Sequence, residues 1–216
     1  MLIPIVMSFF NPPPSPADKL PFISHPGVLA RLLAELGGAA SVGDACGRLF
    51  MQDPALALLA LEAIGQLHPG SQLADMGFEQ QVARLEPVTI KSLAIASAAE
   101  QLAAPPHSPE ALETGWRKAL ATAYFSRALA EKAGYPGLDE AWLAGLMCWL
   151  PRFARNAGAD ADAARQQALA ALDRLPLRTF LPDVLRYINE PAQRLVDAAP
   201  LVRLALAAYR QTMNYP

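Results

Sequence analysis

The sequence predicts an all-α protein, a multi-helix bundle built as one body or as two helical lobes. Apolar residues recur three or four positions apart in successive segments, which Pro and Gly residues separate. No sustained alternation of β-branched residues and no Asn-Gly hairpin signal occurs. One run, residues 141–150 (AWLAGLMCWL), has no charge and no Pro. Because a helix that is apolar all round has no side to expose to water, we expect this run to be the central helix.

Composition narrows the class of protein. At 216 residues the chain can bury a proper core, and 53% hydrophobic against 18% charged residues excludes a disordered protein. A net charge of −2, with Lys and Arg scattered singly, argues against a nucleic acid partner. Cys46 and Cys148 lie in apolar helical patterns, which favours a reducing cytoplasm over a disulfide framework. No stretch reaches the roughly 20 apolar residues that a membrane span needs.

Residues 1–19 are predicted to be an apolar arm followed by a Pro-rich linker, outside a helical domain at residues 20–216. The first ten residues lack the positive charges and the cleavage site of a secretion signal. We expect them to pack on the body, with membrane association as the alternative. The linker, Asn11–Pro16 (NPPPSP), excludes a helix or a central strand.

The first half of the domain contains five helical patterns, each marked by Pro, Gly or a polar capping residue. The sharpest start is Asp53-Pro54, an N-cap followed by Pro at the first helical position. Gly37-Gly38 ends the first pattern. We predict these helices over residues 26–36, 41–51, 54–68, 78–85 and 87–102. The Pro-rich break at residues 105–109 is the predicted boundary between an N-terminal lobe, 20–105, and a C-terminal lobe, 106–216.

The second half opens with Ser108, the predicted N-cap of a long helix in which Trp116 and Tyr124 recur at helical spacing and are expected in the core. Asp139 is the predicted N-cap of the central helix, and Pro151 is expected to stop it. Pro200 is expected to bend the last helix. The predicted ranges are 109–134, 141–150, 161–175, a helix beginning at 181, and 195–209.

The chemistry-bearing residues form no recognisable catalytic pattern. His25, His68 and His107 each lie beside a Pro in a predicted connection, and none has helical ligand spacing with another. They are therefore expected to be surface or capping residues. No Gly-x-Ser-x-Gly elbow and no Gly-rich phosphate loop is present. Cys148 has apolar neighbours, which raise a thiol pKa and leave it inert. No cofactor is expected.

The order of several motifs nevertheless resembles a known family. Asp53-Pro54-Ala55-Leu56 is similar to an Asp-Pro-x-Leu motif, and residues 116–123 (WRKALATA) resemble a Trp-x-His-Ser-x-x-x-Ala helix. Residues 129–146 resemble a Leu-Ala-Glu…Ala-x-x-Ala-Gly-Leu-Leu run. Together they resemble the HDOD (HD-related output domain) family over roughly residues 20–209. The resemblance implies an HD-like helical bundle that serves bacterial signal transduction.

Departures from the HD pattern bear on activity. Catalytic HD phosphohydrolases hold a divalent metal through a His on one helix and a His-Asp pair on the next, and the metal generates the attacking hydroxide. In this sequence those positions are Lys118, Cys148 and Trp149. The resemblance therefore implies a degenerate member without the metal-binding or catalytic residues.

Two functions remain open at this point. The first is a non-catalytic regulatory scaffold that binds a signalling protein, a cyclic dinucleotide or another small ligand in the bacterial cytoplasm. The second is a nucleotide- or phosphate-binding enzyme related to the phosphohydrolases, with an altered site. Its weak candidates for anion binding are Arg117, Lys118 and Arg152.

Overall fold

The computed structural model describes residues 22–37, 42–67, 76–103, 108–155, 160–175 and 180–214. These residues form ten α-helices and two short 3-10 helices, with no strand among them, which confirms the all-α prediction. A single isolated β-bridge joins Phe22 to Ala154 within this part of the chain. The predicted arm and linker at residues 1–19, His68 and His107 lie outside the described residues.

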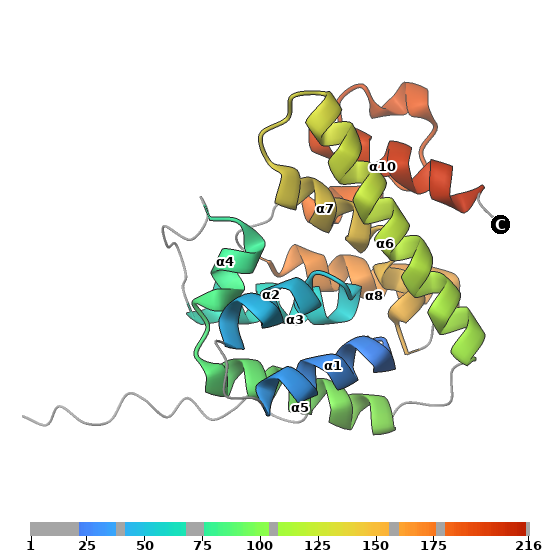
Figure 1. Ribbon diagram of the computed structural model, residues 1–216. Helices are drawn as coiled ribbons and strands as arrows, with labels where there is room; N and C mark the ends of the chain where they lie inside the picture. Colours follow the sequence, from blue (N-terminus) through green and yellow to red (C-terminus); the bar gives the residue numbers. More distant parts are fainter. Residues whose placement is uncertain are drawn as a thin grey trace, which may run out of the picture.

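The first five helices form the lower half of the molecule in Figure 1. Helix α3 is buried along most of its length, and α5 and α2 pack against it. Helix α1 lies against α5 and α2, and α4 lies against α2 (Figure 1). The bounds are Pro26–Leu36 for α1, Val42–Phe50 for α2, Pro54–Leu67 for α3, Phe78–Ala83 for α4 and Pro87–Ala103 for α5.

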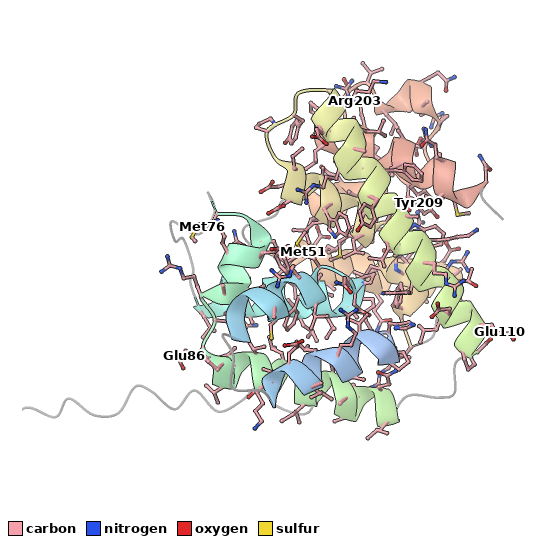
Figure 2. All side chains as sticks on the ribbon, viewed as in Figure 1. Met51, Met76, Glu86, Glu110, Arg203 and Tyr209 are labelled. Atoms are coloured by element: carbon pink, nitrogen blue, oxygen red, sulfur yellow. The ribbon has the colours of Figure 1, made fainter. Side chains whose placement is uncertain are left out.

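The upper half is organised around the long helix α6, which packs against α7 and α10 (Figure 1). Helix α8 packs against α9 and against a 3-10 helix that follows α7. Side chains fill the space between the helices, and Met51 lies near the middle of the molecule (Figure 2). The bounds are Pro109–Lys132 for α6, Leu138–Met147 for α7, Leu150–Phe153 for the 3-10 helix, Ala161–Asp173 for α8, Leu181–Arg186 for α9 and Pro200–Met213 for α10.

Helix α7 occupies the central position that its composition predicts, since every residue from 141 to 150 is buried. A glycine allows its close approach to α6. A Cβ added at Gly145 would lie 2.8 Å from the Thr122 carbonyl oxygen and 2.9 Å from Ala123 Cα. Neither backbone atom can move without shifting α6, so the absence of a side chain at residue 145 sets the distance between the two helices.

The ends of α7 differ from the prediction. The helix begins at Leu138 with Gly137 as its N-cap, so the expectation that Asp139 is the N-cap is wrong. Asp139 lies in the first turn, where the helix dipole favours a negative charge and Arg127 is 3.8 Å away. The α-helix also ends at Met147, and the 3-10 helix continues the chain beyond it.

Pro200 begins a helix and does not bend one. It occupies the first turn of α10, where the missing N–H of proline costs nothing because that group has no partner within the helix. Residues Ala192–Leu195 form a separate 3-10 helix. The predicted continuous helix over 195–209 is therefore wrong at its start, although its later residues are helical.

Contacts across residue 105 join the parts of the chain on either side of it. The Ile23 amide donates to the Phe153 carbonyl at 2.7 Å. Arg155 forms an ion pair with Glu100 of α5, and α3 contacts α7. The division into lobes 20–105 and 106–216 stays a prediction. Within the described residues, no helix has both the length and the apolar character to cross a bilayer.

Candidate functional site

Trp149 follows α7 and lies between α6 and α10. Its side chain is buried, with 4% of the residue exposed. The indole Nε1 donates to the Thr122 hydroxyl of α6 at 2.7 Å, and the ring lies 5.2 Å, centroid to centroid, from that of Tyr209 on α10. The indole therefore fills the space between these helices with its one polar atom satisfied.

The Thr122 hydroxyl belongs to a buried polar contact between α6 and α10. Its oxygen lies 2.7 Å from the Thr212 hydroxyl oxygen. Thr122 is also 2.8 Å from the Lys118 carbonyl, and Thr212 is 2.9 Å from the Tyr209 carbonyl. The two hydroxyls make three contacts: one with the Lys118 carbonyl, one with the Tyr209 carbonyl and one with each other. Because each hydroxyl carries one proton, only two of these three contacts are hydrogen bonds at any moment. Both hydroxyls are thus fully engaged inside the protein.

Cys148 lies one residue earlier and is also buried. Its Sγ lies 3.4 Å from the Ala144 carbonyl and 3.9 Å from the Ala205 carbonyl. Burial raises the pKa of this thiol far above its ordinary value. The thiolate is the form that binds metals, and this burial disfavours it. Within the described part of the chain, no group of three His, Cys, Asp or Glu residues could hold a metal ion.

Lys118 and Arg117, two of the predicted anion-binding residues, lie side by side in sequence on α6. Lys118 is half-buried, whereas Arg117 is exposed. The Arg117 Nε donates to the Glu113 carboxylate at 2.7 Å, one turn earlier in the same helix. This pairing directs Arg117 toward the start of α6.

Arg152, the third predicted residue, is exposed on the 3-10 helix and lies against α6. Its Cβ lies 3.8 Å from where a Cβ at Gly115 would be. Burial raises the pKa of the Tyr209 hydroxyl, and the Arg152 charge partly opposes that rise. The structure thus brings Arg152 near Tyr209 and α6, while Arg117 pairs elsewhere. A role for Arg117, Lys118 and Arg152 in anion binding stays a prediction.

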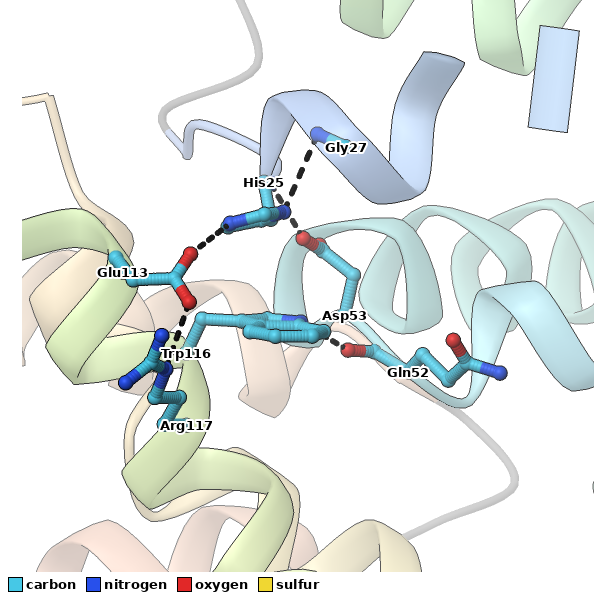
Figure 3. A network of polar contacts seen from close by, with 7 residues as sticks. All are labelled: His25, Gly27, Gln52, Asp53, Glu113, Trp116 and Arg117. Carbon is cyan, nitrogen blue, oxygen red and sulfur yellow. Dashed lines mark hydrogen bonds and ion pairs between the residues drawn. The ribbon is translucent and has the colours of Figure 1, made fainter. Parts of the chain in front are cut away.

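A polar network around His25 joins the start of α1 to α6 (Figure 3). His25 caps α1, because its Nδ1 accepts from the Gly27 amide at 3.2 Å, which confirms the capping role expected from sequence. The other ring nitrogen, Nε2, lies 2.7 Å from the Glu113 carboxylate. Since Nδ1 accepts, the neutral ring carries its proton on Nε2 and donates it to Glu113. The ring also stacks on Trp116, with centroids 4.4 Å apart.

Asp53 connects the same region to α3. One carboxylate oxygen accepts from the His25 amide at 2.6 Å, and the other accepts from the Leu56 amide at 2.9 Å. The second contact confirms Asp53 as the cap of α3. Burial raises the pKa of Asp53 to about 6, although these backbone N–H groups oppose the rise.

The turn before Asp53 receives two indoles from the other half of the molecule. Trp142 of α7 donates its Nε1 to the Met51 carbonyl at 2.9 Å. Trp116 of α6 donates its Nε1 to the next carbonyl, that of Gln52, at 2.7 Å (Figure 3). Two consecutive carbonyls between α2 and α3 are therefore satisfied by side chains from α6 and α7.

Beside this turn lies a cleft of about 460 Å³. Its lining comes from both halves of the molecule: Arg48, Met51, Gln52, Glu79, Leu120, Tyr124, Arg127 and Trp142. Tyr124 is 65% exposed, so the expectation that it is a core residue is wrong. Its ring meets that of Trp142 at 4.6 Å and 73°, an edge contact that leaves the rest of the ring open.

The cleft is the feature that the sequence analysis missed. Leu120, Tyr124 and Arg127 share one face of α6. The charged Arg127 continues an apolar stripe at helical spacing, and this pattern is the sequence signal that could have indicated the cleft. Arg48 and Glu79 gave no such signal, because only the packing of α2 against α4 brings them to the same cleft.

The helices form one half around Asp53-Pro54 and another around Trp116 and Gly145, the arrangement of an HD-like helical domain. The chain belongs to the HDOD family, since the family model of the HDOD domain matches residues 24–187, more than half of its length. The resemblance found in the sequence is thereby confirmed. Comparison with curated proteins and with solved structures gives no match.

Proposed function

We propose that this HDOD domain is a non-catalytic regulatory module of bacterial signal transduction, acting as a helical scaffold for a signalling protein or a small ligand. The observation that carries this proposal is Trp149. It stands where HD phosphohydrolases have the metal-binding carboxylate, and its indole is buried and hydrogen-bonded to Thr122.

The chemistry of the three substituted positions supports the proposal. HD-type hydrolysis relies on a metal that generates hydroxide and neutralises the phosphate. An indole has an N–H donor and no lone pair to give to a metal. The Cys148 thiol is kept protonated by burial, and Lys118 is a cation. These three side chains do not fit a divalent metal.

The composition supports the proposed setting. A formal charge of −2 with dispersed Lys and Arg favours a protein or small-molecule partner over a nucleic acid. Both cysteines are buried and unpaired, in keeping with a bacterial cytoplasm. A cyclic dinucleotide is one small ligand of this kind.

Metal analysis and a hydrolysis assay test the proposal together. The purified chain is incubated with Mn²⁺, Fe²⁺ or Mg²⁺, desalted and analysed for metal, and is then assayed with bis(p-nitrophenyl) phosphate. We expect metal well below stoichiometry and no turnover above background. Stoichiometric metal would overturn the proposal. So would turnover that Lys118→Ala abolishes and that Arg203→Ala, at an exposed position on α10, retains.

A further inference from the structure

We propose that the cleft bounded by α2, α4, α6 and α7 binds a small aromatic anion, a planar ring that carries a phosphate or a carboxylate. The proposal deepens the proposed function. Binding at the cleft stands independently, and only the regulatory role of the ligand rests on that function. Three features of the cleft lead to it: its two arginines, its exposed tyrosine and its size.

The charge of the lining favours an anion. Arg48 comes from α2 and Arg127 from α6, while Glu79 is the acidic residue of the lining. Arg127 is 46% exposed, and its guanidinium lies 3.8 Å from the Asp139 carboxylate, beyond hydrogen-bond distance. Arg127 is thus ion-paired with Asp139 at a distance longer than a hydrogen bond, so a ligand anion would compete with that carboxylate for its N–H groups. The planar guanidinium matches the geometry of a carboxylate or a phosphate.

The frame that holds these charges is closely packed. A Cβ added at Gly47 would lie 3.0 Å from the Glu79 carbonyl oxygen, so α2 and α4 touch directly beside Arg48. Arg48 forms no ion pair among the contacts of the described residues. It is exposed and lines the cleft, on a helix that packs closely against α4.

Tyr124 supplies a surface for a planar ring. Trp142 supports it along one edge and is itself fixed by its hydrogen bond to the Met51 carbonyl. An exposed aromatic ring held in this way is ready to stack on a ligand ring. The lining also includes the apolar side chains of Met51, Leu120 and Trp142.

The size and place of the cleft fit a small ligand. Its volume of about 460 Å³ lies within the range of small-molecule sites. Leu120, Tyr124 and Arg127 line it from one face of α6, whereas Thr122 faces Trp149 and α10. The cleft is thus distinct from the region where HD enzymes bind their metal.

Isothermal titration calorimetry on the full chain tests the proposal with four probes. AMP has a ring and a phosphate, indole-3-acetate has a ring and a carboxylate, adenosine has the ring alone, and inorganic phosphate has the anion alone. We expect saturable binding of AMP or indole-3-acetate, and the tighter of the two is the probe used with the variants. Adenosine and phosphate should bind roughly tenfold more weakly or worse, because each lacks one of the two recognised features.

Variants locate the site. Arg127→Gln and Tyr124→Ala should each weaken binding of the tighter probe roughly tenfold. Arg203→Gln removes the same charge at an exposed position far from Met51 (Figure 2) and should leave binding unchanged. All three positions are exposed, so each variant is expected to fold, and circular dichroism is the check.

Absence of saturable binding by both AMP and indole-3-acetate at millimolar concentration would overturn the proposal. Equal affinity in the wild type and Arg127→Gln would overturn it as well. Either failure leaves the non-catalytic function standing, since that function is tested by metal content and turnover. Conversely, metal-dependent turnover would overturn the proposed function while leaving binding at the cleft intact.

Discussion

Trp149 donates its indole N–H to the Thr122 hydroxyl at 2.7 Å and thereby ties the turn after α7 to the middle of α6. The resemblance to the HD pattern assigns this position to a metal-binding carboxylate. A side chain that fills and satisfies this space stabilises the fold there, and its replacement should be measurable as a loss of stability.

Trp149→Phe should lower the free energy of unfolding by about 1 kcal/mol or somewhat more, because it removes one buried hydrogen bond and part of the ring volume. Trp149→Asp, which introduces the carboxylate that the resemblance assigns to this position, should cost about 3–5 kcal/mol, since it buries a charge without a partner. Urea unfolding measures both. An aspartate variant as stable as the phenylalanine variant would contradict this account of the site.

Gly145→Ala should destabilise the protein by about 1–3 kcal/mol, because the new Cβ would press on the Thr122 carbonyl and on Ala123 Cα. Gly115→Ala is the matched control on α6. The Cβ at Gly115 would meet only Arg152 Cβ, at an ordinary 3.8 Å, so the variant should gain up to about 1 kcal/mol from helix propensity. Thermal unfolding of the two variants should shift in opposite directions.

Asp53 should make stability fall as pH rises from about 4 to about 6. Its pKa is about 6 in the folded protein against an ordinary value of 3.8, so in this window the folded chain holds a proton that the unfolded chain has released. Rising pH then favours the unfolded state, by about 3 kcal/mol in total, and the effect levels off above pH 6. Asp53→Asn cannot titrate and should lack this slope in urea unfolding measured across the window.

Cys46 and Cys148 should resist modification in the folded protein. Both side chains are buried, and burial raises the pKa of each thiol, so little thiolate is present to react. Incubation with 5,5′-dithiobis(2-nitrobenzoate) should release almost no colour until urea unfolds the chain, after which two equivalents should react. Rapid reaction without denaturant would contradict the packing around them.

Sequence patterns predicted most of the helices because capping and apolar spacing are local properties. Asp53-Pro54 and Ser108-Pro109 begin their helices as expected, since a cap and a first-turn proline act over a few residues. The N-cap of α7 was predicted at Asp139 and lies at Gly137, two residues earlier. Local sequence signals do not fix a helix end to within one or two residues.

The candidate site was predicted less well, for a different reason. The prediction that Cys148 and Trp149 replace the HD pair rests on their order after a motif along one segment. The cleft joins Arg48 to Arg127 through the packing of separate helices, which no spacing in the sequence encodes. Tyr124 also shows that helical spacing places a residue on a face without revealing what covers that face.

The turn at Met51 and Gln52, held by Trp142 and Trp116, has a consequence for how a signal could pass through the domain. Moving α6 or α7 relative to α2 would break the hydrogen bond of Trp116 to the Gln52 carbonyl or that of Trp142 to the Met51 carbonyl. The neighbouring Asp53 holds the His25 amide, so the first helix is linked to the same turn. A ligand that shifted α6 would therefore also affect the N-terminal half, through the hydrogen bonds of residues 51–53.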